Sequence, residues 1–184
     1  MIKVYRILTK LENEAFATFS SLDSFITFEK LVDEGKANPN SEIHIKIERI
    51  SDSGISLNSV ELIGLTCDSF VASASVKSKY DSLLAQCGFW HRVTNCQDHY
   101  IFISNVALPI IDINSSDIKY FSDSGKVMEI RSYSFIDSPL LNTMPVFRST
   151  LAPRRELLCT DSFVDEYHSA HGTGLSFQQL NTIG

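Results

Sequence analysis

The sequence lacks long hydrophobic runs, and this bounds the class of protein. No window approaches the roughly eighteen consecutive apolar residues that a transmembrane helix needs. Residues 1–6 also carry too short an apolar run for a secretory signal peptide. We therefore expect a cytoplasmic protein that does not enter a membrane.

Cysteine and basic charge are also scarce. The four cysteines, Cys67, Cys87, Cys96 and Cys159, form no Cys-x-x-Cys pair. We expect them to be free, buried thiols in a reducing compartment, not a disulfide framework. The net charge of −6 argues against a nucleic-acid-binding protein, which typically presents a basic surface.

Signatures of phosphate binding and of serine hydrolysis are missing. The chain has no Gly-x-x-x-x-Gly-Lys loop, no Gly-x-Gly-x-x-Gly after a predicted strand, and no Gly-x-Ser-x-Gly elbow. No motif therefore assigns a catalytic, cofactor-binding or metal-ligating residue, and we expect no cofactor.

The composition that is present is that of a folded protein. Hydrophobic residues make up 43% and charged residues 21% of 184 residues, enough for one sizeable domain or two small ones. Polar residues 51–58 mark a plausible boundary between an N-terminal lobe, residues 1–58, and a main domain, residues 59–184.

Alternating apolar and polar residues predict strands along much of the chain. The predicted strands are residues 2–8, 43–48, 70–73, 99–104, 127–135, 145–148 and 156–159. Residues 35–41 predict a loop, and residues 122–125 (Ser-Asp-Ser-Gly) a hairpin turn. Residues 11–31 stay undecided, because their phenylalanine spacing leans helical but Ser20 and Ser21 interrupt it.

A strand followed by an amphipathic helix occurs twice. After residues 70–73, one face of a predicted helix carries Val76, Tyr80, Leu83, Leu84 and Cys87, with Gly88 as its C-terminal glycine. After residues 156–159, Thr160 or Asp161 is expected to cap a helix that carries Phe163, Tyr167, Ala170 and His171.

The register of this pseudo-repeat is set by periodicity. Residues 65–71 and 158–164 are nearly identical, but aligning them would place a strand against a helix. Pairing Val76 with Phe163 and Tyr80 with Tyr167 keeps both apolar faces inward. The sequence thus predicts an α+β fold, a mostly antiparallel sheet covered by two pseudo-repeated helices, with a small N-terminal lobe.

Four groups of residues are candidates for chemistry or binding. Cys159 near His168 could form a thiol–histidine pair, although a buried thiol is the commoner role of a cysteine in an apolar strand. His168, His171 and Asp165 would offer a metal site with few ligands. Residues 90–92 (Trp-His-Arg) could form a contact patch, or a tryptophan packed at a sheet edge with two solvated neighbours. Residues 153–156 (Pro-Arg-Arg-Glu) are expected to form a polar turn.

Several segments carry a resemblance to a known family. They are residues 70–88, residues 107–112 (Ala-Leu-Pro-Ile-Ile-Asp), residues 145–148 (Pro-Val-Phe-Arg) and the closing residues 172–177 (Gly-Thr-Gly-Leu-Ser-Phe). Over residues 60–180 the chain resembles a family of bacterial immunity proteins of polymorphic toxin systems, formerly a domain of unknown function. The family often has an acidic residue at the start of its helices, whereas the first helix here begins Ser73-Ala-Ser.

The resemblance implies a function without catalysis. An immunity protein is an antitoxin: it binds its cognate toxin domain and blocks the active site or substrate path of the toxin. The implied partner is a protein, with neither nucleic acid nor membrane involved, and no toxin-binding residue follows from the resemblance. The alternative is a small-molecule enzyme that uses the Cys159 and His168 region.

Overall fold

The computed structural model describes residues 2–9, 15–49, 62–65, 69–151 and 156–183. Its strands are β1 (Ile2–Thr9), β2 (Ala15–Phe19), β3 (Ile45–Arg49), β4 (Leu62–Leu65), β5 (Ser69–Ser73), β6 (Gly88–Arg92), β7 (His99–Ser104), β8 (Ala107–Leu108), β9 (Asp117–Tyr120), β10 (Val127–Ser132), β11 (Val146–Ser149), β12 (Leu158–Thr160) and β13 (Leu175–Ile183). Its helices are α1 (Leu22–Glu34), α2 (Ala74–Leu84) and α3 (Asp161–Ser169), with a short 3-10 helix, η2 (Pro139–Asn142). None of the helices in these ranges has the length and apolarity that crossing a bilayer requires.

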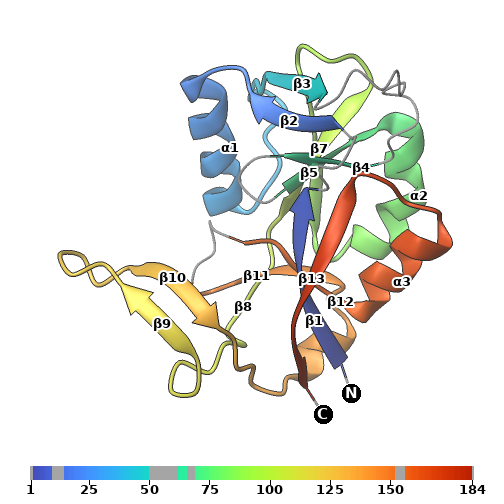
Figure 1. Cartoon of the computed structure of the whole chain (residues 1–184). Coiled ribbons are helices and arrows are strands. Elements are labelled where there is room, and N and C mark those ends of the chain that lie inside the picture. The colour runs from blue at the N-terminus through green and yellow to red at the C-terminus, as the bar shows by residue number, and fades with distance from the viewer. Residues whose placement is uncertain (1, 10–14, 50–61, 66–68, 152–155, 184) are drawn as a thin grey trace.

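The strands form two large sheets and one separate hairpin (Figure 1). The larger sheet has the order β3-β2-β4-β5-β7-β6, the smaller β13-β1-β12-β11-β8, and β9 pairs with β10. Neighbouring strands are antiparallel except β2 with β4 and β8 with β11. The predicted α+β class with mostly antiparallel pairing is confirmed.

Alternation along the strands divides the interior into layers. Successive side chains of a strand point to opposite faces, so Phe70 faces a central core while Val71 faces the other side of the larger sheet. In the smaller sheet Cys159 faces the same central core, and Leu158 faces away from it. The central core thus takes side chains from both sheets.

The helices α2 and α3 cover this central core together, at the right of Figure 1. Val76 and Tyr80 of α2 and Phe163 and Tyr167 of α3 are all buried in it. The rings of Tyr80 and Phe163 lie 6.1 Å apart between centroids. The register predicted from periodicity is confirmed, and in the near-identical heptapeptides Phe70 lies on a strand whereas Phe163 lies on a helix.

The third helix, α1, covers the outer face of the larger sheet. Ser21 caps it, since its hydroxyl accepts a hydrogen bond from the Ser24 N–H, and Gly35 ends it with a left-handed φ of 63°. Phe28 and Leu31 of α1 are buried against the sheet. The interruption at Ser20 and Ser21 is therefore the junction where β2 ends and α1 begins.

Gly88 does not end the helix, contrary to the prediction. The C-cap of α2 is Ala85 in right-handed conformation, and Gly88 begins β6 opposite Ser104. A Cβ atom at Gly88 would lie 2.1 Å from the Ile103 carbonyl oxygen. The glycine is required by the close approach of β6 to β7, not by a helix end.

Two further predicted elements end earlier than expected. The helix α3 ends at Ser169, so His171 lies beyond it, with a left-handed φ of 56°. The strand predicted over residues 127–135 ends at Ser132, and Phe135 instead forms an isolated bridge with Ile111.

The N-terminal residues contribute to both large sheets. β1 lies between β13 and β12 in the smaller sheet, and β2 lies between β3 and β4 in the larger one. The predicted boundary, residues 51–58, lies outside the described residues.

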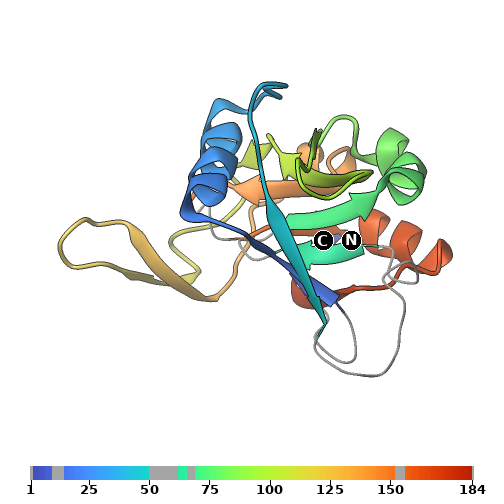
Figure 2. The same cartoon turned by 90° about the horizontal axis from the view of Figure 1, so that it is seen from above.

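The hairpin of β9 and β10 projects from the body of the molecule, and we call residues 113–136 the arm (Figures 1 and 2). Its tip turns at Gly125, which has a left-handed φ of 64°, and the Gly125 N–H donates to the Phe121 carbonyl. The predicted hairpin turn at residues 122–125 is confirmed. In both views the arm extends on the side where α1 lies.

Candidate functional site

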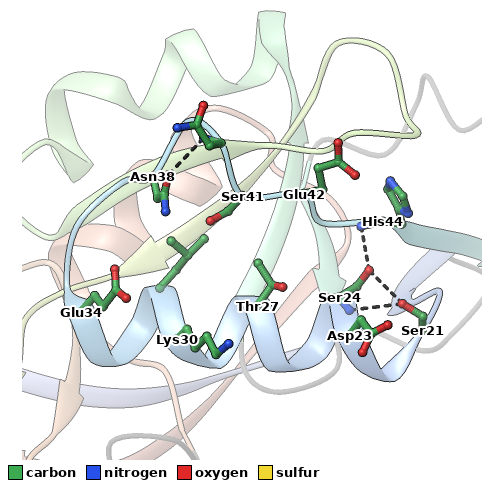
Figure 3. Close-up of a pocket in the computed structure, with 12 residues that line it drawn as sticks. Ser21, Asp23, Ser24, Thr27, Lys30, Glu34, Asn38, Ser41, Glu42 and His44 are labelled. Carbon is green, nitrogen blue, oxygen red and sulfur yellow. Dashed lines mark hydrogen bonds between the residues drawn. The ribbon is translucent and has the colours of Figure 1, made fainter.

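A polar groove of about 600 Å³ opens between α1 and the segment that follows it, residues 35–44 (Figure 3). Nearly all its lining side chains are polar. They are Ser21, Asp23, Ser24, Thr27, Lys30, Leu31, Glu34, Asn38, Asn40, Ser41, Glu42 and His44. A ligand in this groove would meet hydrogen-bonding and charged groups rather than an apolar wall.

Ser24 holds the two walls of the groove together. Its buried hydroxyl accepts a hydrogen bond from the His44 N–H at 3.1 Å and another from the Ser21 hydroxyl at 3.1 Å (Figure 3). On the opposite wall the Asn38 carboxamide oxygen accepts from the Asn40 N–H at 3.1 Å. The groove is therefore formed before any partner arrives.

Negative charge dominates this region. Three carboxylates, Asp23, Glu34 and Glu42, line the groove with one amine, Lys30. Residues 22–44 as a whole carry five carboxylates against two lysines, in a chain whose net charge is −6. Half of the net charge thus lies on α1 and residues 35–44, which favours a cationic ligand or surface.

A second cavity of about 630 Å³ adjoins the groove and shares Ser41 and Glu42 with it. Its other wall includes Trp90, His91 and Arg92 of the edge strand β6. The indole of Trp90 packs edge-on against Phe70 and Phe102, as expected for a tryptophan at a sheet edge.

His91 is buried, although the sequence predicted a solvated residue. Successive side chains of β6 point to opposite faces, so His91 lies on the opposite face from Trp90 and Arg92. The His91 side chain is buried, and its Nε2 donates a hydrogen bond to the Ser41 carbonyl at 3.1 Å. Burial lowers the pKa of His91, and this hydrogen bond opposes the shift. Arg92 is exposed, as predicted. His91 thus attaches residues 35–44 to the sheet edge.

Cys159 does not have the environment of a nucleophile. Its side chain is fully buried in the central core, and burial, with the charge of Asp161 added, raises the pKa of its thiol well above the ordinary value. A reactive cysteine needs a lowered pKa and access to solvent. His168, its proposed partner, lies on the exposed side of α3.

The other cysteines of the described residues meet the expectation of buried thiols only in part. Cys87 is buried, Cys96 is partly buried, and both are free thiols like Cys159. Burial raises the pKa of both thiols. Cys67 lies outside the described residues.

The residues predicted as candidate metal ligands do not form a metal-binding group with other side chains of the described residues. Asp165, His168 and His171 are exposed, and His171 lies beyond the end of α3. Within the described residues, no group of three or more histidines, cysteines and carboxylates is placed to hold a metal ion. Of the predicted polar turn, residues 153–155 lie outside the described residues and Glu156 lies within them.

Sequence reasoning missed a polar network at the base of the arm. Arg6 Nη2 donates to the Tyr133 hydroxyl at 2.7 Å and to Glu156 Oε1 at 2.7 Å. The Tyr133 hydroxyl in turn donates to Glu156 Oε2, and burial followed by the contact with Glu156 raises its pKa. The three residues stand at least 23 positions apart in the chain, so no local pattern could reveal the network.

Comparison with known proteins does not assign the chain to a family. No protein-family model matches the chain, and no curated protein matches it.

Proposed function

We propose that this chain is an immunity protein that neutralises a bacterial toxin domain by forming a direct complex with it. The proposal rests on the family resemblance of residues 60–180, and the acidic groove between α1 and residues 35–44 is the structural feature that supports it. On this proposal the chain catalyses no reaction and needs no cofactor.

The charge of the groove supports a basic partner. A surface with an excess of carboxylates attracts a cationic protein over several ångströms and aligns it before contact. Toxin domains that act on nucleic acid or nucleotides are of this kind, because their substrates are anionic. Covering such a basic surface would block access of the substrate to the toxin.

The compartment follows from the same proposal. Within the described residues, Cys87, Cys96 and Cys159 are free thiols, which suits a reducing cytoplasm, where an incoming toxin domain would meet its target. We therefore propose that the complex forms in the cytoplasm.

Affinity capture from the source organism tests this function. The tagged chain is expressed in its own host, and the proteins that co-purify are identified by mass spectrometry. The expected result is recovery of a large toxin, or of its C-terminal fragment, in stoichiometric amount. If the toxin is expressed and only background proteins are recovered, the proposal fails.

A double substitution separates binding from catalysis. Cys159→Ala with His168→Ala removes both groups that an enzyme of this region would use. Because Cys159 is buried and its thiol pKa is raised, we expect the variant to protect cells from the toxin as well as the unmodified chain does. Full loss of protection, with the fold intact by circular dichroism, would favour an enzyme instead.

A further inference from the structure

The strand β6 lies at an edge of the larger sheet, with β7 on one side only. Backbone hydrogen bonds at both of its ends show which of its residues bond to β7. The Asn105 N–H donates to the Cys87 carbonyl at 3.2 Å, and the Val93 N–H donates to the His99 carbonyl at 2.9 Å. Residues that bond to the neighbouring strand alternate with residues that do not in an antiparallel pair. The odd-numbered residues of β6 therefore bond to β7.

The even-numbered residues of β6, Gly88, Trp90 and Arg92, direct their N–H and carbonyl groups away from β7. None of these groups forms a hydrogen bond with the part of the chain that the structure describes. The chain itself uses the same edge at the next such position, where the Thr94 N–H donates to the Ile43 carbonyl at 2.9 Å. Beyond that point the edge is open to another backbone.

The opposite edge of the same sheet, β3, is covered at its start by a side chain. The Asn95 Oδ1 accepts a hydrogen bond from the Ile45 N–H at 2.9 Å, and the Asn95 Nδ2 donates to the Ile45 carbonyl at 2.8 Å. The carboxamide thus satisfies both backbone groups, as a neighbouring strand would. Among the described residues, no side chain does the same for β6.

The second cavity, of about 630 Å³, lies along this open edge. Trp90 and Arg92 line it from one face of β6 and His91 from the other, so the cavity lies beside the strand and not over one face. Its far wall comes from residues 37–42, which the hydrogen bond from His91 to the Ser41 carbonyl holds in place. An extended segment would therefore find a formed groove as well as open backbone partners.

The side chains of an added strand would meet aromatic rings. Tyr100 lies opposite Arg92 on β7, and both Tyr100 and Trp90 are partly buried and line the cavity. One carboxylate, Glu42, is balanced in the lining by one guanidinium, Arg92. Backbone pairing and aromatic contact, rather than charge, would therefore hold the segment.

The cavity adjoins the acidic groove, because Ser41 and Glu42 line both. A basic partner that covers the groove would bring a neighbouring segment to β6. A second copy of this chain fits less well, since its own net charge of −6 would be repelled by the groove. The toxin domain is therefore the occupant that the adjoining groove favours.

We propose that an extended segment of the toxin domain adds to β6 as a further strand of the larger sheet, with an apolar side chain set against Trp90 and Tyr100. This inference rests on the proposed function and adds the place and mode of the contact. In strand addition, main-chain hydrogen bonds supply affinity and contacts of alternate side chains supply specificity.

Two substitutions at one position test the backbone contact. Arg92→Pro and Arg92→Ala both remove the exposed side chain, but only proline also removes the outward N–H. Proline is accepted at a strand edge where the N–H faces solvent. The probe is the toxin domain recovered by affinity capture. We expect Kd to be at least about 10-fold higher for Arg92→Pro than for Arg92→Ala.

Amide hydrogen exchange, resolved by NMR, tests the same contact without a substitution. In the unmodified chain the Trp90 and Arg92 amides should exchange at least about 10-fold more slowly when the toxin domain is bound. The Phe89 and His91 amides, which bond to β7, are the control and should be protected in both states. This measurement decides the matter if Arg92→Pro melts at a lower temperature than Arg92→Ala.

The outcomes separate the two proposals. If affinity capture recovers no toxin domain, the proposed function fails and this inference fails with it. If the toxin domain binds and the exchange of the Trp90 and Arg92 amides does not change, only the inference is overturned. Equal affinity of a folded Arg92→Pro and of Arg92→Ala overturns it as well. So does sedimentation that shows a dimer of the unmodified chain and a monomer of Arg92→Pro, because a second copy would then occupy the edge.

Discussion

At the scale of single residues, three buried or nearly buried polar side chains join distant segments of the chain. Ser24 links α1 to His44, His91 links β6 to Ser41, and Tyr133 links the arm to Arg6. Each forms hydrogen bonds within the protein, which is the condition under which polar groups are tolerated inside. The groove and the arm both depend on such contacts.

Tyr133→Phe tests the anchor of the arm. The substitution removes the hydroxyl that accepts from Arg6 and donates to Glu156, while the ring keeps its place beside Phe135. We expect the free energy of unfolding to fall by about 1–3 kcal/mol, measured by urea denaturation. Tyr120→Phe, at an exposed ring, is the matched control and should change nothing. Equal stability of both variants would contradict the role assigned to Tyr133.

The buried His91 should make stability sensitive to acid. Its pKa in the folded protein lies below the ordinary 6.5, so the unfolded chain takes up the proton first as pH falls. The contribution of this residue is complete above pH 6.5 and is lost as pH falls toward the lower folded pKa. We expect the urea midpoint to decline less between about pH 7.5 and about pH 5.5 in His91→Gln than in the unmodified chain.

The control for this experiment is another histidine. His168→Gln replaces an exposed residue of α3 and should retain the pH dependence of the unmodified chain. An identical slope for His91→Gln and the unmodified chain would show that His91 does not contribute to the acid sensitivity.

At the scale of elements, the sequence predicted most of the fold where periodicity was strong. Val76 and Tyr80 of α2 and Phe163 and Tyr167 of α3 were placed correctly, because helical spacing reports burial directly. His171, predicted on the same face as Phe163, is exposed and lies beyond the end of α3.

The secondary structure of residues 11–31 stayed undecided because α1 follows β2 so closely. A stretch of sequence long enough to show the periodicity of a helix or of a strand therefore contains parts of both. Gly88 was misplaced because a glycine required by a close strand approach looks, in sequence, like a helix end.

Gly88→Ala tests the correction. A methyl group there would collide with the Ile103 carbonyl oxygen, which belongs to backbone, so β6 must shift away from β7. We expect a loss of about 2–3 kcal/mol in the free energy of unfolding. Gly125→Asn is the comparison: Asn tolerates the left-handed conformation, nothing lies within 4 Å of a Cβ atom there, and stability should hardly change. A neutral Gly88→Ala would contradict the strand-approach explanation.

At the scale of the whole molecule, the placement of charge in space depends on the fold and cannot be read from the sequence. Residues 22–44, with five carboxylates against two lysines, and the arm, with three carboxylates against three basic residues, are far apart in the chain, yet they extend on one side of the structure. Composition gave the net charge of −6 but not its placement, since placement depends on how the two sheets and the arm pack. The groove could therefore not be located in advance, and for the arm only the hairpin turn at residues 122–125 was predicted, not its projection from the body of the molecule.

Neutralising the groove should slow association with a basic partner. Asp23→Asn, Glu34→Gln and Glu42→Gln together remove the three groove carboxylates. We expect the association rate constant for the toxin domain to fall about 5- to 10-fold at low salt, with a smaller difference at high salt. Asp165→Asn with Glu166→Gln on α3 is the control. An unchanged association rate would contradict the charge argument, and stopped-flow mixing measures it.

Protection of growing cells tests the proposed function most directly. The toxin domain recovered by affinity capture is induced in a bacterial host, with or without this chain. We predict growth arrest by the domain alone and restored growth when this chain is co-expressed, with the two proteins co-purifying as a complex. A domain that arrests growth equally in the presence of the well-expressed chain would contradict the proposed function.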